Sequence, residues 1–182
     1  MIGGHEVNVS NSKMKFAAAL KELLHSCTLE EVTTEEIVAK AKLSRQTFYR
    51  NFTDKYELAF WCYERDITPV FERYVNGEIT FHQMNLAMLE IFRKDKEFYG
   101  NLFQNFEMQN SFFQQFHHYS LYTLSRIVGR QQNKELSSAY KLYTYGCNNM
   151  IMDWATTGMK ESDEEMANLF DIALPDCLKS IL

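Results

Sequence analysis

The sequence predicts an all-α protein, and two observations carry this prediction. Its 182 residues include only seven Gly and two Pro, fewer than the frequent turns of an all-β chain require. Apolar residues instead recur at helical spacing along most of the chain, with capping signals between the segments. We expect about nine helices, arranged as a flexible arm over 1–11, an N-terminal helical unit over 12–58 and a larger all-helical unit over 59–182.

The N-terminal unit opens with a helix from Ser12, because apolar residues recur on one face of this segment as far as Leu24. The next boundary is marked by Thr33 and Glu36, which form a capping box. In such a box each side chain accepts a hydrogen bond from the other residue's backbone N–H. The box predicts a short helix over 34–41.

A second short helix follows almost at once. Ser44 is a suitable N-cap for a helix over 45–52, and only Lys42 and Leu43 separate this helix from the one before it. Two short helices joined by so tight a turn predict a helix-turn-helix over 33–52.

A longer helix begins at Lys55, capped by Thr53 and Asp54. We expect Pro69 to kink or end it near Ile67, because proline lacks the N–H that the helix needs. Further helices are predicted over 80–94, 96–106, 109–130, 134–158 and 162–181.

The last of these helices has both a start signal and a stop signal in its sequence. Ser162 and Glu165 form a second capping box at its start, and Pro175 is expected to break it near its end.

The charge of the chain is uneven. The net charge is −5, yet residues 1–56 carry eight Lys and Arg against seven Asp and Glu, whereas 57–182 carry 11 against 17. Four of the eight cations lie between Lys42 and Lys55, where only Asp54 opposes them. A clustered set of cations can hold DNA even on an acidic protein.

The 45–52 helix has one apolar and one polar side. Phe48 lies four residues before Phe52, so both rings are predicted to face inward. The side chains left facing outward are Arg45, Gln46, Tyr49 and Arg50. Because Arg pairs with guanine and Gln with adenine in the major groove, the positions of Arg45 and Gln46 favour contacts with base edges.

This segment resembles the signature of the TetR-type bacterial transcriptional regulators. The signature reads Ala-Gly-Val-Ser, two variable residues, Thr-Leu-Tyr-x-His-Phe, and then Lys and Leu three apart. The stretch 41–58 follows it without a gap, with conservative changes at Leu43 and Phe48 and matches at Ala41, Ser44, Thr47, Tyr49, Phe52, Lys55 and Leu58. The resemblance extends over about 12–63.

The stretch departs from the signature at two positions. Lys42 replaces the usual turn glycine, so the turn must accept a side chain at the cost of a left-handed backbone. Asn51 replaces the common His, but its amide can still donate a hydrogen bond to a phosphate.

The resemblance implies a ligand-responsive repressor that binds a palindromic double-stranded DNA operator as a homodimer. An activator, or a response to a partner protein, fits the same fold. In this family pattern Thr47, Tyr49 and Lys55 contact phosphates. The candidate DNA-binding residues are Thr34, Ser44, Arg45, Gln46, Thr47, Tyr49, Arg50, Asn51 and Lys55.

The C-terminal unit is similar to one branch of the family, the regulators linked to dihydroxyacetone kinase, over 92–99 and 145–154. Its many aromatic residues have two interpretations, a plain helical core or an effector cavity between helices. The candidate pocket residues are Phe98, Phe103, Phe113, Phe116, Tyr119, Tyr122 and Tyr143.

The last two long helices each carry an apolar face, and the resemblance implies a dimer through them. The alternative is that one of these faces packs only inside its own subunit. The candidate interface residues are Met150, Ile151, Trp154, Met166, Leu169, Phe170 and Ala173.

Other functions find little support in the sequence. The cysteines show no metal-ligand or disulfide spacing, which indicates ordinary thiols in a reducing cytoplasm. His117 and His118 lack a ligand partner at metal-binding spacing, so we interpret them as a surface or pocket-rim pair. We expect no metal, no cofactor, no catalytic site and no membrane segment. A helical enzyme or apolar-ligand carrier with an aromatic cavity is the alternative from another class.

Overall fold

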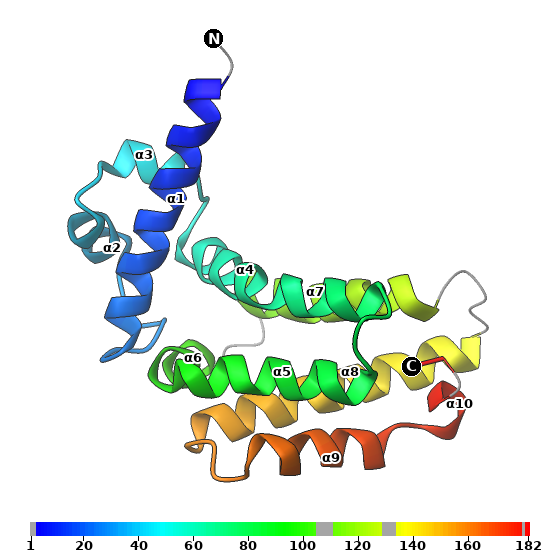
Figure 1. Ribbon diagram of the computed structural model, residues 1–182. Helices are drawn as coiled ribbons and strands as arrows, with labels where there is room; N and C mark the ends of the chain where they lie inside the picture. Colours follow the sequence, from blue (N-terminus) through cyan, green and yellow to red (C-terminus); the bar gives the residue numbers. More distant parts are fainter. Residues whose placement is uncertain (1–2, 105–110, 129–133, 180) are drawn as a thin grey trace.

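The computed structural model describes residues 3–104, 111–128, 134–179 and 181–182, and within these ranges it contains helices and no strand (Figure 1). The all-α prediction is confirmed, with ten helices in these ranges where about nine were predicted. They are α1 (Gly3–Leu24), α2 (Thr34–Ala41), α3 (Arg45–Tyr49), α4 (Lys55–Val75), α5 (Phe81–Lys94), α6 (Lys96–Phe103), α7 (Ser111–Val128), α8 (Lys134–Thr156), α9 (Asp163–Ala173) and α10 (Asp176–Lys179).

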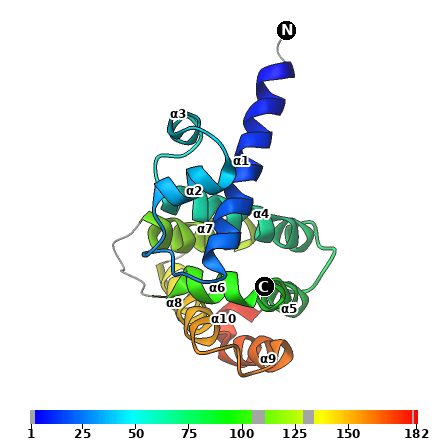
Figure 2. The same ribbon diagram turned by 90° about the vertical axis from the view of Figure 1, so that its left-hand side faces the viewer.

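Helices α1 to α3 form a head at one end of the molecule, and α4 to α10 form a body beside it (Figures 1 and 2). In the body, α4 packs against α5 and α7, α9 packs against α5, and α6 packs against α8. Helix α4 also contacts α1, so it belongs to both parts. The boundary expected between 58 and 59 therefore falls inside one continuous helix.

Two helix ends in the N-terminal half correct the sequence prediction. Helix α1 begins at Gly3, so the expected arm without structure is wrong for 3–11. No Gly or Pro interrupts the chain over 5–15, and a helix that is already anchored extends easily through such a stretch. Helix α4 continues through Pro69 to Val75, because buried apolar residues on both sides of the proline pack into one core.

In the C-terminal half, the predicted start and stop signals of the last long helix are confirmed. The capping box at Ser162 opens α9, and the helix ends at Ala173, two residues before Pro175. The ends predicted at 106, 109 and 130 lie outside the described residues. None of the described helices combines enough length with enough apolarity to span a bilayer.

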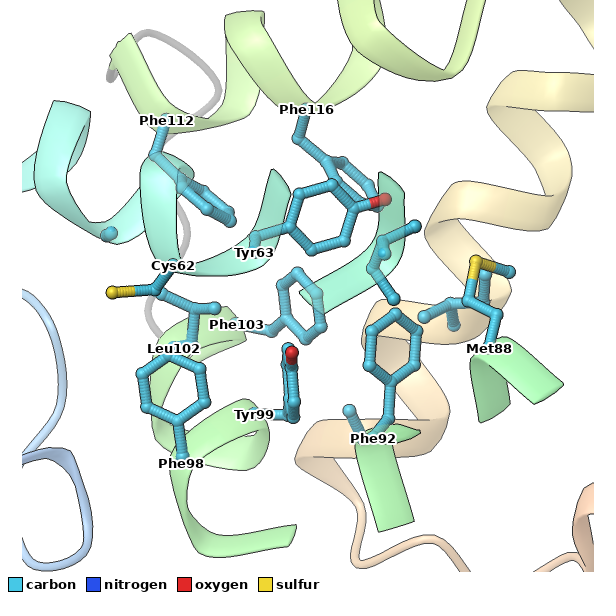
Figure 3. Close-up of a cluster of buried hydrophobic side chains, with 14 of the residues drawn as sticks. Cys62, Tyr63, Met88, Phe92, Phe98, Tyr99, Leu102, Phe103, Phe112 and Phe116 are labelled. Atoms are coloured by element: carbon cyan, nitrogen blue, oxygen red, sulfur yellow. The ribbon is translucent and has the colours of Figure 1, made fainter. Parts of the chain in front are cut away.

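A solid aromatic core fills the centre of the body (Figure 3). The ring of Tyr63 lies 5.1 Å from that of Phe116 and 6.3 Å from that of Phe92. Phe103 lies 5.5 Å from Phe116 with tilted rings and 6.0 Å from Phe92 with edge-on rings. Such arrangements are favourable beyond the burial of apolar area. The aromatic cluster is therefore core.

One arginine fastens the connection between α8 and α9 to α5. Arg93 Nε donates to Asp163 at 2.6 Å, and Nη1 donates to the carbonyl of Met159 at 3.0 Å. Its guanidinium also lies over the ring of Trp154, 5.0 Å from the centroid. These contacts fix the start of α9 against the body.

The head is joined to the body by a charged cluster. Lys21 of α1 lies 2.6 Å from the carboxylate of Asp66 on α4 and 3.4 Å from that of Asp95, which precedes α6. The Tyr99 hydroxyl donates to Asp66 at 3.0 Å. Because all four groups are largely buried or half-buried, they link α1 to two body helices at once.

The contact between α5 and α9 makes stability depend on pH. His82 Nδ1 is hydrogen-bonded to Asp171, and its Nε2 lies 3.4 Å from the carboxylate of Glu164. The hydrogen bond to Asp171, followed by the charges of both carboxylates, holds the pKa of His82 above its usual value. A raised folded-state pKa stabilises the fold below the unfolded-state pKa, and this gain is lost as the pH rises through the folded-state pKa.

We therefore expect His82→Gln to lower the melting temperature more at about pH 5.5 than at about pH 8.5, on either side of the usual histidine pKa. Circular dichroism melts at both pH values measure the difference. Asp171→Asn removes the partner and should give the same pattern. Equal losses at the two pH values would contradict a charged His82.

Candidate DNA-binding surface and effector site

The turn of the helix-turn-helix has the strained backbone that its sequence predicts. The capping box of Thr33 and Glu36 opens α2, and Lys42 ends the helix with φ of 54° and ψ of 42°, in the left-handed region. The Lys42 N–H donates to carbonyls in the last turn of α2. Residue 42 thus serves as the turn residue although it carries a side chain, as expected from the departure from the family signature.

Helix α3 is held at its start and along its inner side. Ser44 Oγ accepts from the Thr47 N–H at 3.1 Å, and the two hydroxyls lie 2.8 Å apart. Phe48 is fully buried, with its ring 5.2 Å from Phe16 of α1 and 5.8 Å from Phe52. The helix ends at Tyr49, three residues earlier than predicted.

The outer side of α3 presents four exposed side chains, Arg45, Gln46, Tyr49 and Arg50, as the spacing predicts. Arg45 forms an ion pair with Glu35 of α2, in which both side chains are more than half exposed. The sequence alone does not predict the partnership with Glu35, because an ion pair between two helices depends on the angle at which they cross.

Two predicted phosphate contacts are turned inward instead. Lys55 Nζ donates to the carbonyls of Glu30 at 2.9 Å and Val32 at 2.8 Å, and partial burial lowers the pKa of Lys55. Asn51 Nδ2 donates to the carbonyl of Thr47 at 2.7 Å, which closes the end of α3. Both side chains hold the head together, so we correct their role. Thr34, at the first position of α2, is half-buried.

The predicted pocket residues do not form a common cavity. Phe98, Phe116 and Tyr143 are buried in the core. Tyr119 is half-buried with its hydroxyl 2.6 Å from that of Thr68, and Tyr122 is 57% exposed. None of these five residues lines the groove described next, so their assignment to a shared pocket is corrected.

The other two, Phe103 and Phe113, line an open groove of about 670 Å³ between α7 and α8. Small-molecule sites have volumes of about 300–1,000 Å³. His117 and His118 both line the groove, which agrees with their interpretation as a pocket-rim pair. Helix α8 also contributes polar residues at helical spacing that the sequence did not predict as pocket residues, Tyr145, Asn149, Asp153 and Thr156.

The predicted interface residues divide into two groups. The structure buries Ile151, Trp154, Met166 and Phe170 in the subunit's own core, at 3% exposure or less. A side chain enclosed in its own subunit cannot contact a second one, so these four are corrected. Met150, Leu169 and Ala173 are exposed, and so are two apolar residues that the prediction omitted, Leu142 on α8 and Ile172 on α9.

Comparison with known proteins gives the family. The model of the bacterial regulatory proteins of the tetR family matches residues 17–60, which include the whole helix-turn-helix. A second model, described as a transcriptional regulator C-terminal region, matches residues 80–176. The chain belongs to the TetR family. It is a DNA-binding transcriptional regulator, and the segment of this TetR-family protein that the tetR model matches includes α2 and α3.

Solved structures show the same fold. A TetR transcriptional regulator from Streptococcus agalactiae has a TM-score of 0.67 at 13% identity, covering 94% of this chain and 98% of that one. The dihydroxyacetone kinase operon activator DhaS has a TM-score of 0.57 at 19% identity, covering 93% and 96%. A TetR-family regulator from Mesorhizobium loti has a TM-score of 0.53 at 15% identity, covering 94% and 97%.

A curated relative gives a sequence match as well. The HTH-type dhaKLM operon transcriptional activator DhaS of Lactococcus lactis is 30% identical over 97 residues, which are 50% of this chain and 50% of the relative. The chain thus spans about half the length of that relative in this match.

The strained turn of this TetR-family chain gives a test of the head. A left-handed backbone lowers the stability of the fold by about 1–2 kcal/mol when the residue carries a Cβ, and glycine avoids this cost. Part of the gain from glycine is offset, because its more flexible unfolded backbone loses more conformational entropy on folding. We expect Lys42→Gly to raise the melting temperature, by the equivalent of about 0.5–1 kcal/mol. Lys42→Ala is the matched control, because it removes the charge but keeps the strain. A melting temperature that rises equally in both variants would show that charge is responsible.

Proposed function

We propose that two copies of the chain place their α3 helices in successive major grooves of a palindromic operator. The observation that supports this best is the arrangement of α3, in which buried Phe48 fixes the helix and four exposed side chains project from its other side. Arg45 and Gln46 stand at the start of the helix and read base edges. Tyr49 and Arg50 contact phosphates, which position the helix without reading sequence.

The ion pair between Arg45 and Glu35 bears on this role. An exposed pair contributes about 0–1 kcal/mol, whereas a bidentate contact of Arg with guanine contributes about 1–3 kcal/mol of discrimination. Guanine can therefore replace Glu35 as the partner of Arg45. In the absence of DNA, Glu35 keeps the guanidinium near the outer side of the turn.

The dimer forms through the exposed sides of α8 and α9. Leu142 is 74% exposed and Ile172 is 80% exposed, and Met150 and Leu169 are each about 40% exposed. Gly146 lies on the same side of α8 as Leu142 and Met150, and a Cβ there would meet nothing in its own subunit. Glycine within a helix costs about 0.5–1 kcal/mol relative to alanine, and close approach of a second α8 accounts for it.

The sign of regulation follows the relatives. The curated relative DhaS is named the transcriptional activator of the dhaKLM operon, which favours activation over the repression that the family resemblance first suggested. The body responds to an effector, either a small molecule or a partner protein. The protein acts in the cytoplasm, where its DNA lies.

Base reading by Arg45 is tested by comparing two substitutions. We expect Arg45→Ala to flatten the base preference at one position in each half-site, with a loss of about 1–3 kcal/mol of discrimination. Arg50→Ala should instead weaken all sequences alike and lower the slope of log affinity against log salt by about one per subunit. Binding titrations with single-base operator variants measure both effects. An unchanged base preference in Arg45→Ala would refute its role.

The interface is tested by placing a charge on an exposed residue of α8. We expect Leu142→Asp to give a monomer by light scattering, with an unchanged melting profile at low concentration and loss of binding to the palindrome. Tyr122→Asp is the matched control, because Tyr122 is also exposed but lies on α7. A Leu142→Asp variant that remains a DNA-binding dimer would place the interface elsewhere.

A further inference from the structure

A buried polar chain lies under the groove between α7 and α8. Ser120, Asn148 and His117 are each 9% exposed or less. The Ser120 hydroxyl lies within 3.4 Å of Asn148 Oδ1, and Asn148 Nδ2 lies 3.1 Å from His117 Nδ1. The Ser120 hydroxyl donates to the nearer carbonyl of Phe116 at 3.0 Å, and the amide N–H of Asn148 faces the imidazole.

This chain determines which nitrogen of His117 carries the proton. An amide nitrogen only donates, so Nδ1 must accept, and the proton of the neutral ring resides on Nε2. Burial also lowers the pKa of His117, which keeps the ring neutral near pH 7. The Nε2–H is a donor fixed in position.

The donor points toward the groove. The two nitrogens lie on opposite sides of the imidazole, and Nδ1 is occupied by the interior amide. Within the part of the chain that the structure describes, Nε2 has no hydrogen-bond partner, and it is not among the enclosed polar atoms. Since His117 lines the groove, Nε2–H is available to a ligand there.

Two aromatic rings flank this donor, and its described surroundings carry no Lys or Arg. The ring of Phe113 lies 4.1 Å from that of His117, and the ring of Tyr145 lies 4.9 Å from it, both edge-on. Among the described lining residues there is no Lys or Arg, whereas Asp153 contributes a carboxylate. An anionic ligand would be repelled, and a flat ring finds matching surfaces.

We propose that this groove binds a neutral, ring-bearing small molecule whose acceptor oxygen takes the hydrogen bond from His117 Nε2–H. The inference rests on the proposed effector response and gives its site and ligand class. The groove is built partly from α8, which also carries Leu142 and Met150 of the proposed interface. A ligand here would therefore press on the helix that sets the position of the second subunit.

The probe for this site is acetophenone, a neutral ring with a carbonyl oxygen, and benzoate is its anionic counterpart. Nitrogen NMR of the histidine side chains in the full chain should show His117 protonated at Nε2. Acetophenone should shift this signal and those of the groove residues, and benzoate should bind more weakly. Protonation of His117 at Nδ1, or acetophenone-induced signal shifts confined to residues outside the groove, would overturn the proposal. Both results are obtained with the natural protein alone.

Two matched variants complete the test. His117→Phe keeps a ring but removes the donor, and we expect it to weaken acetophenone binding about fivefold, the effect of one hydrogen bond. His25→Phe makes the same change at an exposed histidine that does not line the groove, and it should leave the affinity unchanged. Equal affinity of the His117→Phe variant and the natural protein would overturn the proposal. Binding is measured without DNA, so a failure of the effector response would appear separately, as unchanged operator affinity with the probe bound.

Discussion

The packing of Phe48 against Phe16 is the contact on which the DNA-binding surface depends. Helix α3 has only five residues, and so short a helix is not stable alone in water. Its direction comes from the buried ring of Phe48, which meets α1 on one side and Phe52 on the other. Lys13 of α1 lies over the Phe52 ring, 5.3 Å from its centroid, and closes this small core. The outward direction of Arg45 follows from the inward direction of Phe48.

The same helix α1 connects this surface to the body. Phe16 contacts α3, and one and a half turns later Lys21 enters the charged cluster with Asp66 and Asp95. At the end of α1, Asn101 of α6 donates to the carbonyl of Leu24 at 2.8 Å. Because a helix moves as a stiff element, a shift of α4 or α6 would move α1, and with it the Phe16 ring against which α3 packs. The fold thus offers a mechanical route between the body and the head.

The sequence predicts best what depends on neighbouring residues. The capping boxes at Thr33 and Ser162, the N-cap at Ser44 and the strained turn at Lys42 are all local, and the structure confirms them. The apolar stripe of α8 likewise identifies a buried face. The stripe does not show which neighbour covers that face. It therefore predicts Ile151 and Trp154 at a subunit interface, whereas their own subunit buries them.

The roles that the sequence did not predict depend on distant contacts. Lys55 donates to two carbonyls more than twenty residues away in the sequence, and Glu35 of α2 forms an ion pair with Arg45 of α3. The donor of His117 is fixed by Asn148 on another helix. No spacing pattern in the sequence predicts these contacts, because each depends on how whole helices pack against one another.

The central claim is that a two-fold pair of α3 helices reads DNA, and selection of bound sequences from a random pool tests it most directly. Sequencing the bound fraction, followed by a protection footprint, gives both the motif and its symmetry. The account predicts two inverted half-sites whose centres are about 10–10.5 base pairs apart, or a multiple of that spacing. A single asymmetric site, or no enrichment over the starting pool, would contradict it.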